Sequence, residues 1–170
     1  GGGGGDGTSR PERQVIAKAR PREIFHKRWM PRPDRAWRSA GARSGVSLAD
    51  LKARINVIEE GYEFFLAYAA QGLTDDAASR AGVQLRDYLE RFGAALDGLE
   101  EVFRPYLPAG DATDAALRVL KRDAGASRAL VGLVAGRESV SSELIDNLNA
   151  SIHVRALLTD VFVLAGPVGV

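Results

Sequence analysis

The fold class is decided by residues 47–69, SLADLKARINVIEEGYEFFLAYA. Apolar side chains recur there at alternating spacings of three and four residues, which places them on one face of an α-helix over three heptads. Ser47 and Asp50 stand at the start in a capping-box-like arrangement, in which each side chain bonds the backbone of the other. The stretch therefore predicts a long helix with one apolar seam, made of Leu48, Leu51, Ile55, Ile58, Tyr62, Phe65 and Ala69.

Three more stretches show the same helical period, and each is bounded by capping residues or by Pro and Gly. The bounds that we expect are Thr74 (as N-cap) to Phe103, where the break at Pro105 follows, Asp111 or Thr113 to Gly136, and about Ser142 to Leu164, with Gly166-Pro167 ending the last helix. The early core positions of that last helix are expected at Ile145, Leu148 and Ile152. Short connections favour antiparallel neighbours. The chain is therefore expected to be all-α, an antiparallel four-helix up-down bundle over residues 46–166 followed by a tail at 167–170.

Two of the expected helices carry more apolar side chains than one core-facing seam needs. In the first helix, Val57, Gly61, Phe64 and Tyr68 form a second apolar line, and residues 154–164 are apolar on most sides. A helix that is apolar on two faces is either central in its domain or part of an interface. We expect the bundle to contact a partner through Phe64, Tyr68, Val161 and Phe162.

The formal net charge of +1 hides two halves of opposite sign. Residues 1–45 hold 11 Lys and Arg against 4 Asp and Glu, whereas residues 46–170 hold 12 against 18. The first nine residues form a Gly-rich start that is expected to be flexible. Four of the seven prolines fall in residues 10–45, where they oppose a long helix. We interpret 10–45 as an extended basic arm with aromatic anchors.

The arm is expected to bind through Phe25, Arg28, Trp29, Arg32, Arg35, Trp37 and Arg38. Three occupants remain open. The arm could dock on the acidic body of its own chain or of a neighbouring copy, because opposite charges attract. It could thread into a larger protein assembly, with its aromatic side chains in pockets. It could also bind nucleic acid or an anionic membrane surface.

The residue types present exclude several kinds of chemistry. The chain has no cysteine, which removes thiolate nucleophiles, Fe–S clusters and Cys-ligated zinc. The expected helices of residues 46–166 also lack the Glu-x-x-His motif of di-iron bundles, so we expect neither a metal nor a cofactor. The longest apolar stretch near the C-terminus falls far short of the roughly 20 residues that a transmembrane helix needs. We expect a soluble protein, intracellular or organellar after removal of an N-terminal segment.

One polar line on the fourth expected helix needs an interpretation. Its members share a face at spacings of three, four and seven residues, and they are Glu143, Asp146, Asn149, His153 and Asp160. We favour a solvated outer face. A polar contact with a partner, or a ligand-binding or catalytic His153, are the alternatives.

These observations predict a non-catalytic accessory or assembly subunit of a larger protein complex, which forms homo- or hetero-oligomers. The helical body would dock through its apolar faces and the basic arm would act as a tether. A module that binds nucleic acid or an anionic surface through the arm is the alternative. A small-ligand-binding or catalytic bundle that uses His153 is the third hypothesis.

Overall fold

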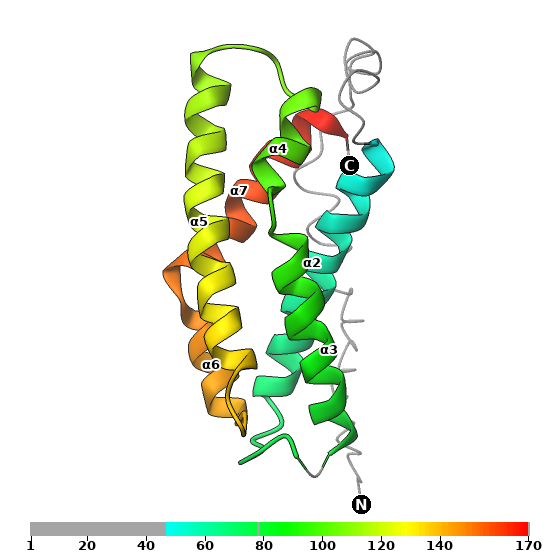
Figure 1. Ribbon diagram of the computed structural model, residues 1–170, viewed down its shortest axis with the longest axis vertical. Helices are drawn as coiled ribbons and strands as arrows, with labels where there is room; N and C mark the ends of the chain where they lie inside the picture. Colours follow the sequence, from blue (N-terminus) through cyan, green and yellow to red (C-terminus); the bar gives the residue numbers. More distant parts are fainter. Residues whose placement is uncertain (1–46, 78, 170) are drawn as a thin grey trace, which may run out of the picture. The chain divides into compact units, whose positions relative to one another are not determined.

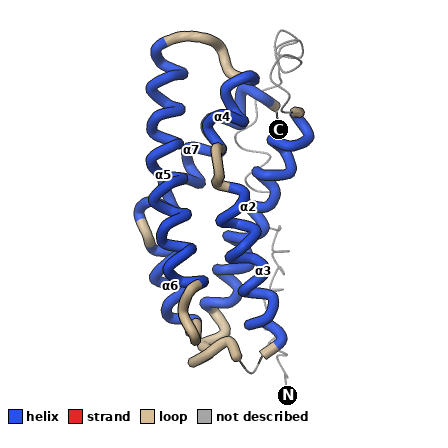
Figure 2. The backbone as a smooth tube through the Cα atoms, viewed as in Figure 1, coloured by secondary structure: helices blue, strands red, loops and turns tan. Residues whose placement is uncertain are grey.

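The computed structural model describes residues 47–77 and 79–169. Within these residues the protein is all-α, with six α-helices, one 3₁₀ turn and no strand (Figures 1 and 2). The all-α prediction is therefore confirmed for this part of the chain. The Gly-rich start and the basic arm, with the predicted residues Phe25, Arg28, Trp29, Arg32, Arg35, Trp37 and Arg38, lie outside the described residues.

The first described helix, α2 (Leu48–Ala69), forms as predicted. The Ser47 hydroxyl accepts a hydrogen bond from the Asp50 backbone N–H, and the Asp50 carboxylate accepts one from the Ser47 N–H at 3.0 Å. This capping box satisfies two donors that the first helical turn would otherwise leave unpaired. The predicted seam faces the core, because Leu51, Ile55, Ile58 and Phe65 are all buried.

The second expected helix begins later and is shorter than predicted. Helix α3 (Arg80–Ala95) is capped by Ser79 and not by Thr74, and it stops before Leu96. The chain then turns at Gly98, whose φ of 58° lies in the left-handed region that glycine adopts without strain. It continues as α4 (Leu99–Phe103) and the 3₁₀ turn η3 (Arg104–Tyr106).

The third expected helix is continuous. Helix α5 (Asp111–Ala135) starts at the first of the two predicted residues, and Gly136 is its C-cap as predicted. Asp111 and Asp114 stand in its first turn, where negative charge interacts favourably with the helix dipole.

The fourth expected helix is broken into α6 (Ser142–Ala150) and α7 (Ile152–Val168), which are bent by 57° at Ser151. The predicted end at Gly166-Pro167 is wrong, because α7 continues through Pro167. A proline so close to the end of a helix disturbs a single late turn, and the burial of Ala165 and Val168 holds that turn in place. The break also changes the phase of the apolar pattern. Ile152, predicted to be a core residue, is 75% exposed.

The helices pack around one apolar core. Helix α2 lies against α3 and α6, α3 lies against α5, and α5 lies against α4 and α7. Figure 1 shows that α5 and α7 run in opposite directions, since the chain descends along α5 and rises along α7. The largest fully buried side chains include Tyr68, Phe65, Phe92 and Phe103.

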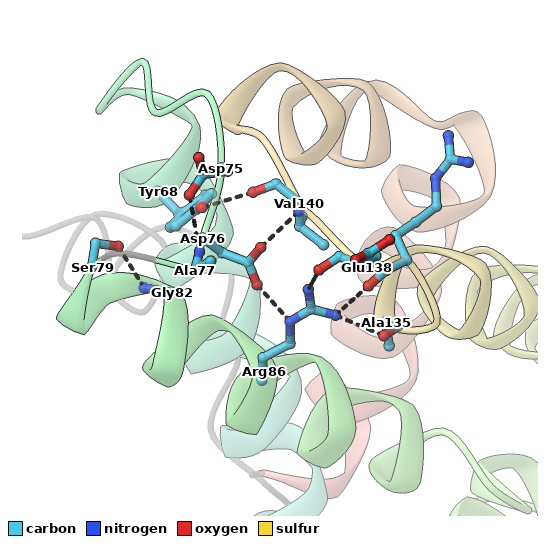
Figure 3. Close-up of polar contacts among 11 residues, drawn as sticks. Tyr68, Asp75, Asp76, Ala77, Ser79, Gly82, Arg86, Ala135, Glu138 and Val140 are labelled. Atoms are coloured by element: carbon cyan, nitrogen blue, oxygen red, sulfur yellow. Dashed lines mark hydrogen bonds and ion pairs between the residues drawn. The ribbon is translucent and has the colours of Figure 1, made fainter.

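A buried polar cluster joins the α2–α3 connection to the α5–α6 connection (Figure 3). The Asp76 carboxylate accepts from Arg86 Nε at 2.6 Å and from the Val140 N–H at 2.7 Å. Arg86 also donates to the carbonyls of Ala135 and Arg137 at 2.8 and 2.9 Å. This cluster fixes the chain just before α6 and explains why residues 74–77 do not extend α3.

Candidate functional site

The four predicted docking residues of the helical body do not form one surface. Tyr68 is fully buried and its hydroxyl donates to the Val140 carbonyl at 2.9 Å. Val161 is also fully buried. Phe64 is partly buried and stacks on Tyr88, with ring centroids 4.2 Å apart, while Phe162 is partly buried on α7. Docking through these residues stays a prediction, but only the two phenylalanines present any side-chain surface.

The large exposed apolar side chains lie mostly elsewhere. Four of the six are on α5 and α7: Val119 (40% exposed), Leu133 (71%), Ile152 (75%) and Val163 (60%). None of the four was predicted to be exposed, and Ile152 was expected in the core. The sequence does contain a pattern that could have predicted an apolar line on α5. Val119, Ala126 and Leu133 are seven residues apart, and residues at that spacing lie on one face of a helix.

These side chains lie on the outer sides of α5 and α7 but are spread along the helix axes, because Leu133 and Val163 stand about 15 Å from the contact between α5 and α7 in opposite directions. Asp123 of α5 and His153 of α7 meet at that contact. Val119 lies four residues before Asp123, and Ala156 lies three residues after His153, so both stand one turn away on the same flank. The two helices are antiparallel and their buried leucines face the core. The flank of α5 that carries Val119 and the flank of α7 that carries Ala156 therefore face solvent on the same side of the contact.

We call the outer sides of α5 and α7 the α5–α7 outer face, and its exposed members are Val119, Arg122, Leu133, Ile152 and Val163. Arg118 and Arg155 stand on the flanks of their helices away from the α5–α7 contact, about 140° around α5 from Asp123 and about 200° around α7 from His153. The one charged member of the face is Arg122. Arg118 and Arg155 form no ion pair within residues 47–77 and 79–169, whereas Arg122 lies 3.2 Å from Asp123. The face therefore combines exposed aliphatic side chains with one ion-paired arginine.

A polar cluster lies directly beneath this face. Asp123 is 2% exposed, and its carboxylate lies 3.3 Å from Nδ1 of His153 and 3.2 Å from the Arg122 guanidinium. Asp160 stands two turns after His153 on α7 and has one carboxylate oxygen that is buried without a hydrogen-bond partner. Two carboxyl groups, one imidazole and one guanidinium thus meet between α5 and α7.

The two carboxyl groups of the cluster differ in their pKa. A hydrogen bond from Arg122 lowers the pKa of Asp123, and the interaction with His153 adds to this against the opposing effect of burial. Burial raises the pKa of Asp160, and the negative charge of Asp123 raises it further. The pair is therefore arranged so that Asp123 keeps its charge and Asp160 is the carboxyl group that holds a proton more readily.

Two more polar side chains are buried without partners, one a turn after Asp123 on α5 and the other just before the bend, on α6. The Ser127 hydroxyl and both amide atoms of Asn149 have no hydrogen bond within the described residues. The polar line that begins at Glu143 was interpreted as a solvated face, and this interpretation holds for only some of its residues. Glu143 and Asp146 are exposed, but Asn149 is buried because the bend at Ser151 turns it toward the interior.

The described residues hold no group of three or more His, Cys, Asp or Glu side chains that could bind a metal ion. An open depression of about 460 Å³ lies at the other end of α6, between Thr74 and the α5–α6 connection. Its lining combines Arg137 with Glu138 and Glu143, so neither sign of ligand charge is favoured there. In the Asp123 cluster, Asp160 is the carboxyl group whose pKa is raised by burial, and His153 is the member whose ring is partly exposed.

Across the part of the chain that the structure describes, no single helix is both long and apolar enough to cross a membrane. Only α6 and α7 taken together meet these criteria, and the bend of 57° separates them.

The comparisons with known proteins identify no relative: no family model matches the chain, and no curated protein or solved structure is significantly similar to it. The described residues define the class only as an all-helical protein in which a buried aspartate, Asp123, contacts the partly exposed His153 between two helices.

Proposed function

We propose that this protein is a non-catalytic accessory or assembly subunit, which docks on another protein through the α5–α7 outer face. The observation that carries the proposal is the exposure of Leu133, Ile152 and Val163, each at least 60% accessible, along the outer sides of α5 and α7, which pack against each other. Large exposed apolar side chains are typical of interaction sites.

The arrangement of the helices supports a rigid supporting role. We interpret α3 with α4, and α6 with α7, as two interrupted rods, which with α2 and α5 make an antiparallel four-helix up-down bundle. The basic arm over residues 10–45 would serve as the tether, because its excess of positive charge complements the negative charge of residues 46–170.

The polar cluster favours a binding role over a catalytic one. Asp123 and Ser127 are almost completely buried, so a substrate could not reach either side chain without separating α5 from α7. His153 is the member of the cluster with an accessible ring, and no nucleophilic side chain bonds to it in the described residues. General acid–base chemistry needs such a group within hydrogen-bond reach of the reacting atom.

Site-specific photo-crosslinking tests the proposal. A photoreactive phenylalanine derivative is placed at Val163 of the full chain, and the variant is expressed in the native cells. The matched control carries the same group at Val83 of α3, which is 74% exposed but lies away from the face. We expect a discrete protein adduct from position 163 that is absent from position 83 and is lost when Leu133→Asp is added. The absence of an adduct, or identical adducts from both positions, would contradict the docking role.

A further inference from the structure

We propose that the solvent side of α7 pairs with the same side of a second copy of the chain, an inference that rests on the proposed docking function and names the partner. The two α7 helices would lie parallel to each other about a twofold axis, so that the apolar residues of one copy meet the same residues of the other. Three features of α7 support this partner: an exposed apolar line, small side chains within the line, and one charge of each sign beside it.

An apolar line runs along the solvent side of α7. Its members, which we call the α7 outer line, are spaced by four, three, four and three residues: Ile152, Ala156, Thr159, Val163 and Gly166. Ile152 is 75% exposed and Val163 is 60% exposed, while Leu157 on the opposite side of the helix is fully buried. The Thr159 hydroxyl donates to the Arg155 carbonyl at 3.1 Å, so the polar group of this residue is satisfied within the helix. Helix α7 therefore presents one apolar side to the core and a second one to solvent.

The spacing and size of these side chains fit a second helix laid along the line. Alternating steps of three and four residues form the seam along which two helices pack in a coiled coil, at the heptad positions a and d. Ala156 and Val163 take position a in this pattern, and Ile152, Thr159 and Gly166 take position d. A Cβ atom at Gly166 would meet no described heavy atom within 4 Å outside its own stretch of helix, so packing within the chain does not require a glycine there. Such a glycine allows the backbone of a neighbouring helix to come close.

One positive and one negative side chain flank the α7 outer line. Arg155 precedes a position a and Asp160 follows a position d, so the two stand on opposite sides of the line. Arg155 forms no ion pair within residues 47–77 and 79–169. Asp160 is partly exposed, and one of its carboxylate oxygens has no hydrogen-bond partner among these residues. Both side chains therefore leave an interaction available to a partner.

These two charges distinguish a parallel pair of helices from an antiparallel one. In a parallel pair, the residue before position a of one helix lies beside the residue five positions later, after position d, of the other helix. Arg155 of each copy would therefore lie beside Asp160 of the other copy, once on each side of the contact. In an antiparallel pair each flank faces the same flank of the partner, which would bring Arg155 toward Arg155 and Asp160 toward Asp160. Charge complementarity thus favours a second copy in the parallel orientation.

The size of the contact predicts a reversible dimer. Helix α7 has 17 residues and is therefore about 25 Å long, so one helix from each copy buries less than the roughly 1,600 Å² of a standard protein interface. The helix is already folded in the single copy, so pairing does not bear the cost of ordering it. We therefore expect a monomer–dimer equilibrium that shifts with protein concentration.

Sedimentation velocity of the full chain over a range of concentrations tests the pairing. Val163→Asp should weaken dimerisation about tenfold or more, because it buries two carboxylates in the apolar seam. Arg155→Glu should weaken it about threefold or more, since two attractions become repulsions. The matched control is Arg118→Glu, which makes the same change of charge on α5, away from the line, and should leave dimerisation unchanged. All three positions are exposed, so circular dichroism should show equal helical content.

A single engineered cysteine reports the orientation, because the chain contains none of its own. Ile152 stands at one end of the α7 outer line, so the two copies of this residue meet only in a parallel pair. Mild oxidation of Ile152→Cys should therefore give a disulfide-linked dimer. Val83→Cys is the control and should stay largely unlinked, since residue 83 is 74% exposed but lies on α3.

The outcomes separate the second copy from the docking function. The pairing is overturned if the chain does not self-associate, or if Val163→Asp or Arg155→Glu leaves the dimer unchanged. A dimer that Ile152→Cys does not link overturns the parallel orientation. Binding of a monomeric chain to 3:1 phosphatidylcholine–phosphatidylglycerol vesicles, lost in Val163→Asp, would assign the line to lipid and overturn the pairing too.

The photo-crosslinking experiment at Val163 fails or succeeds independently of these measurements. An adduct with a different protein, formed by a chain that stays monomeric, keeps the docking function and overturns the second copy. A dimer that Ile152→Cys links, without any adduct to a different protein, supports the second copy and contradicts docking on another protein.

Discussion

Nδ1 of His153 lies 3.3 Å from Oδ1 of Asp123, although the two residues stand 30 positions apart and belong to different helices. The contact joins α7 to α5 just below the exposed face, and it brings the buried Asp123 charge close to Asp160. The stability of the α5–α7 packing is therefore linked to the protonation of this group of side chains.

Asp160→Asn should stabilise the protein at neutral pH. The folded-state pKa of Asp160 is raised by burial and by Asp123, so the folded state binds this proton more tightly than the unfolded state does. Ionisation of Asp160 therefore costs stability above the unfolded pKa of about 3.8, and the full cost is reached above the raised folded pKa. The side chain is partly exposed, so we expect a gain of about 1 kcal/mol or less in the free energy of unfolding.

Urea unfolding of both proteins at several pH values measures this gain. The advantage of Asp160→Asn should grow as the pH rises from 3 to 7. Asp123→Asn provides the internal check, because it removes the charge that acts on Asp160 and should shrink the effect of Asp160→Asn in the double variant. A benefit that does not change with pH would show that the carboxylate charge is not its cause.

Ser127→Ala should raise stability slightly. The Ser127 hydroxyl is fully buried and has no hydrogen-bond partner in the described residues, so the folded state bears its desolvation cost without compensation. Alanine removes that cost and keeps the helix, with an expected gain of about 1 kcal/mol. Thermal unfolding measures the change. A loss of stability would instead reveal a hydrogen bond that this hydroxyl makes in the folded protein.

The parts of the fold that the sequence predicts well are those governed by short-range rules. Along helix α2 the apolar residues keep one helical spacing without interruption. Its two capping residues stand only three positions apart in the sequence. The choice of N-cap for α3 is different. Thr74 and Ser79 are both good capping residues, and the outcome depends on Asp76, which bonds Val140 across 64 positions. No local pattern reports such a contact.

The candidate site was harder to predict for the same reason. The prediction treats residues 142–164 as one straight helix with a single register. In the structure the helix bends at Ser151, so that Ile152 is exposed and Asn149 is buried. Asp123 follows Lys121 and Arg122, so along the chain it resembles one more solvated charge. Its burial follows from the packing of α7 on α5, which becomes visible only in three dimensions.

Arg86→Ala should destabilise the protein by about 3 kcal/mol, because it leaves the buried Asp76 carboxylate without its cationic partner and deprives three carbonyls of a donor. Burial acts to raise the pKa of Asp76, but hydrogen bonds from Arg86 and Val140 outweigh it and lower the pKa overall. The stability that this group contributes is therefore present above about pH 3.8 and lost as the pH falls through the lowered folded pKa.

Denaturant unfolding of Arg86→Ala against Arg104→Ala tests this prediction. Arg104 pairs with Asp114 at 2.7 Å, but both side chains are about half exposed, so its loss should cost less than about 1 kcal/mol. The two variants should also differ in acid, where the deficit of Arg86→Ala narrows because wild-type Asp76 becomes protonated too. Equal costs at neutral pH would mean that the Asp76 cluster does not hold the α5–α6 connection.

Gly82→Ala should be strongly destabilising although alanine favours helices. Gly82 lies in the first turn of α3, and a Cβ atom there would overlap the backbone carbonyl of Asp76, which the Arg86 cluster holds in place. Relief requires movement of the backbone, so we expect a loss of about 3 kcal/mol or more. Gly93→Ala in the same helix is the matched control. Its Cβ would meet only Val131 Cγ1, at an ordinary contact distance of 3.8 Å, so the helix propensity of alanine should add about 1 kcal/mol of stability. Opposite signs for the two variants in thermal unfolding are the expected result, whereas a neutral Gly82→Ala would show that the α2–α3 connection can move away from α3.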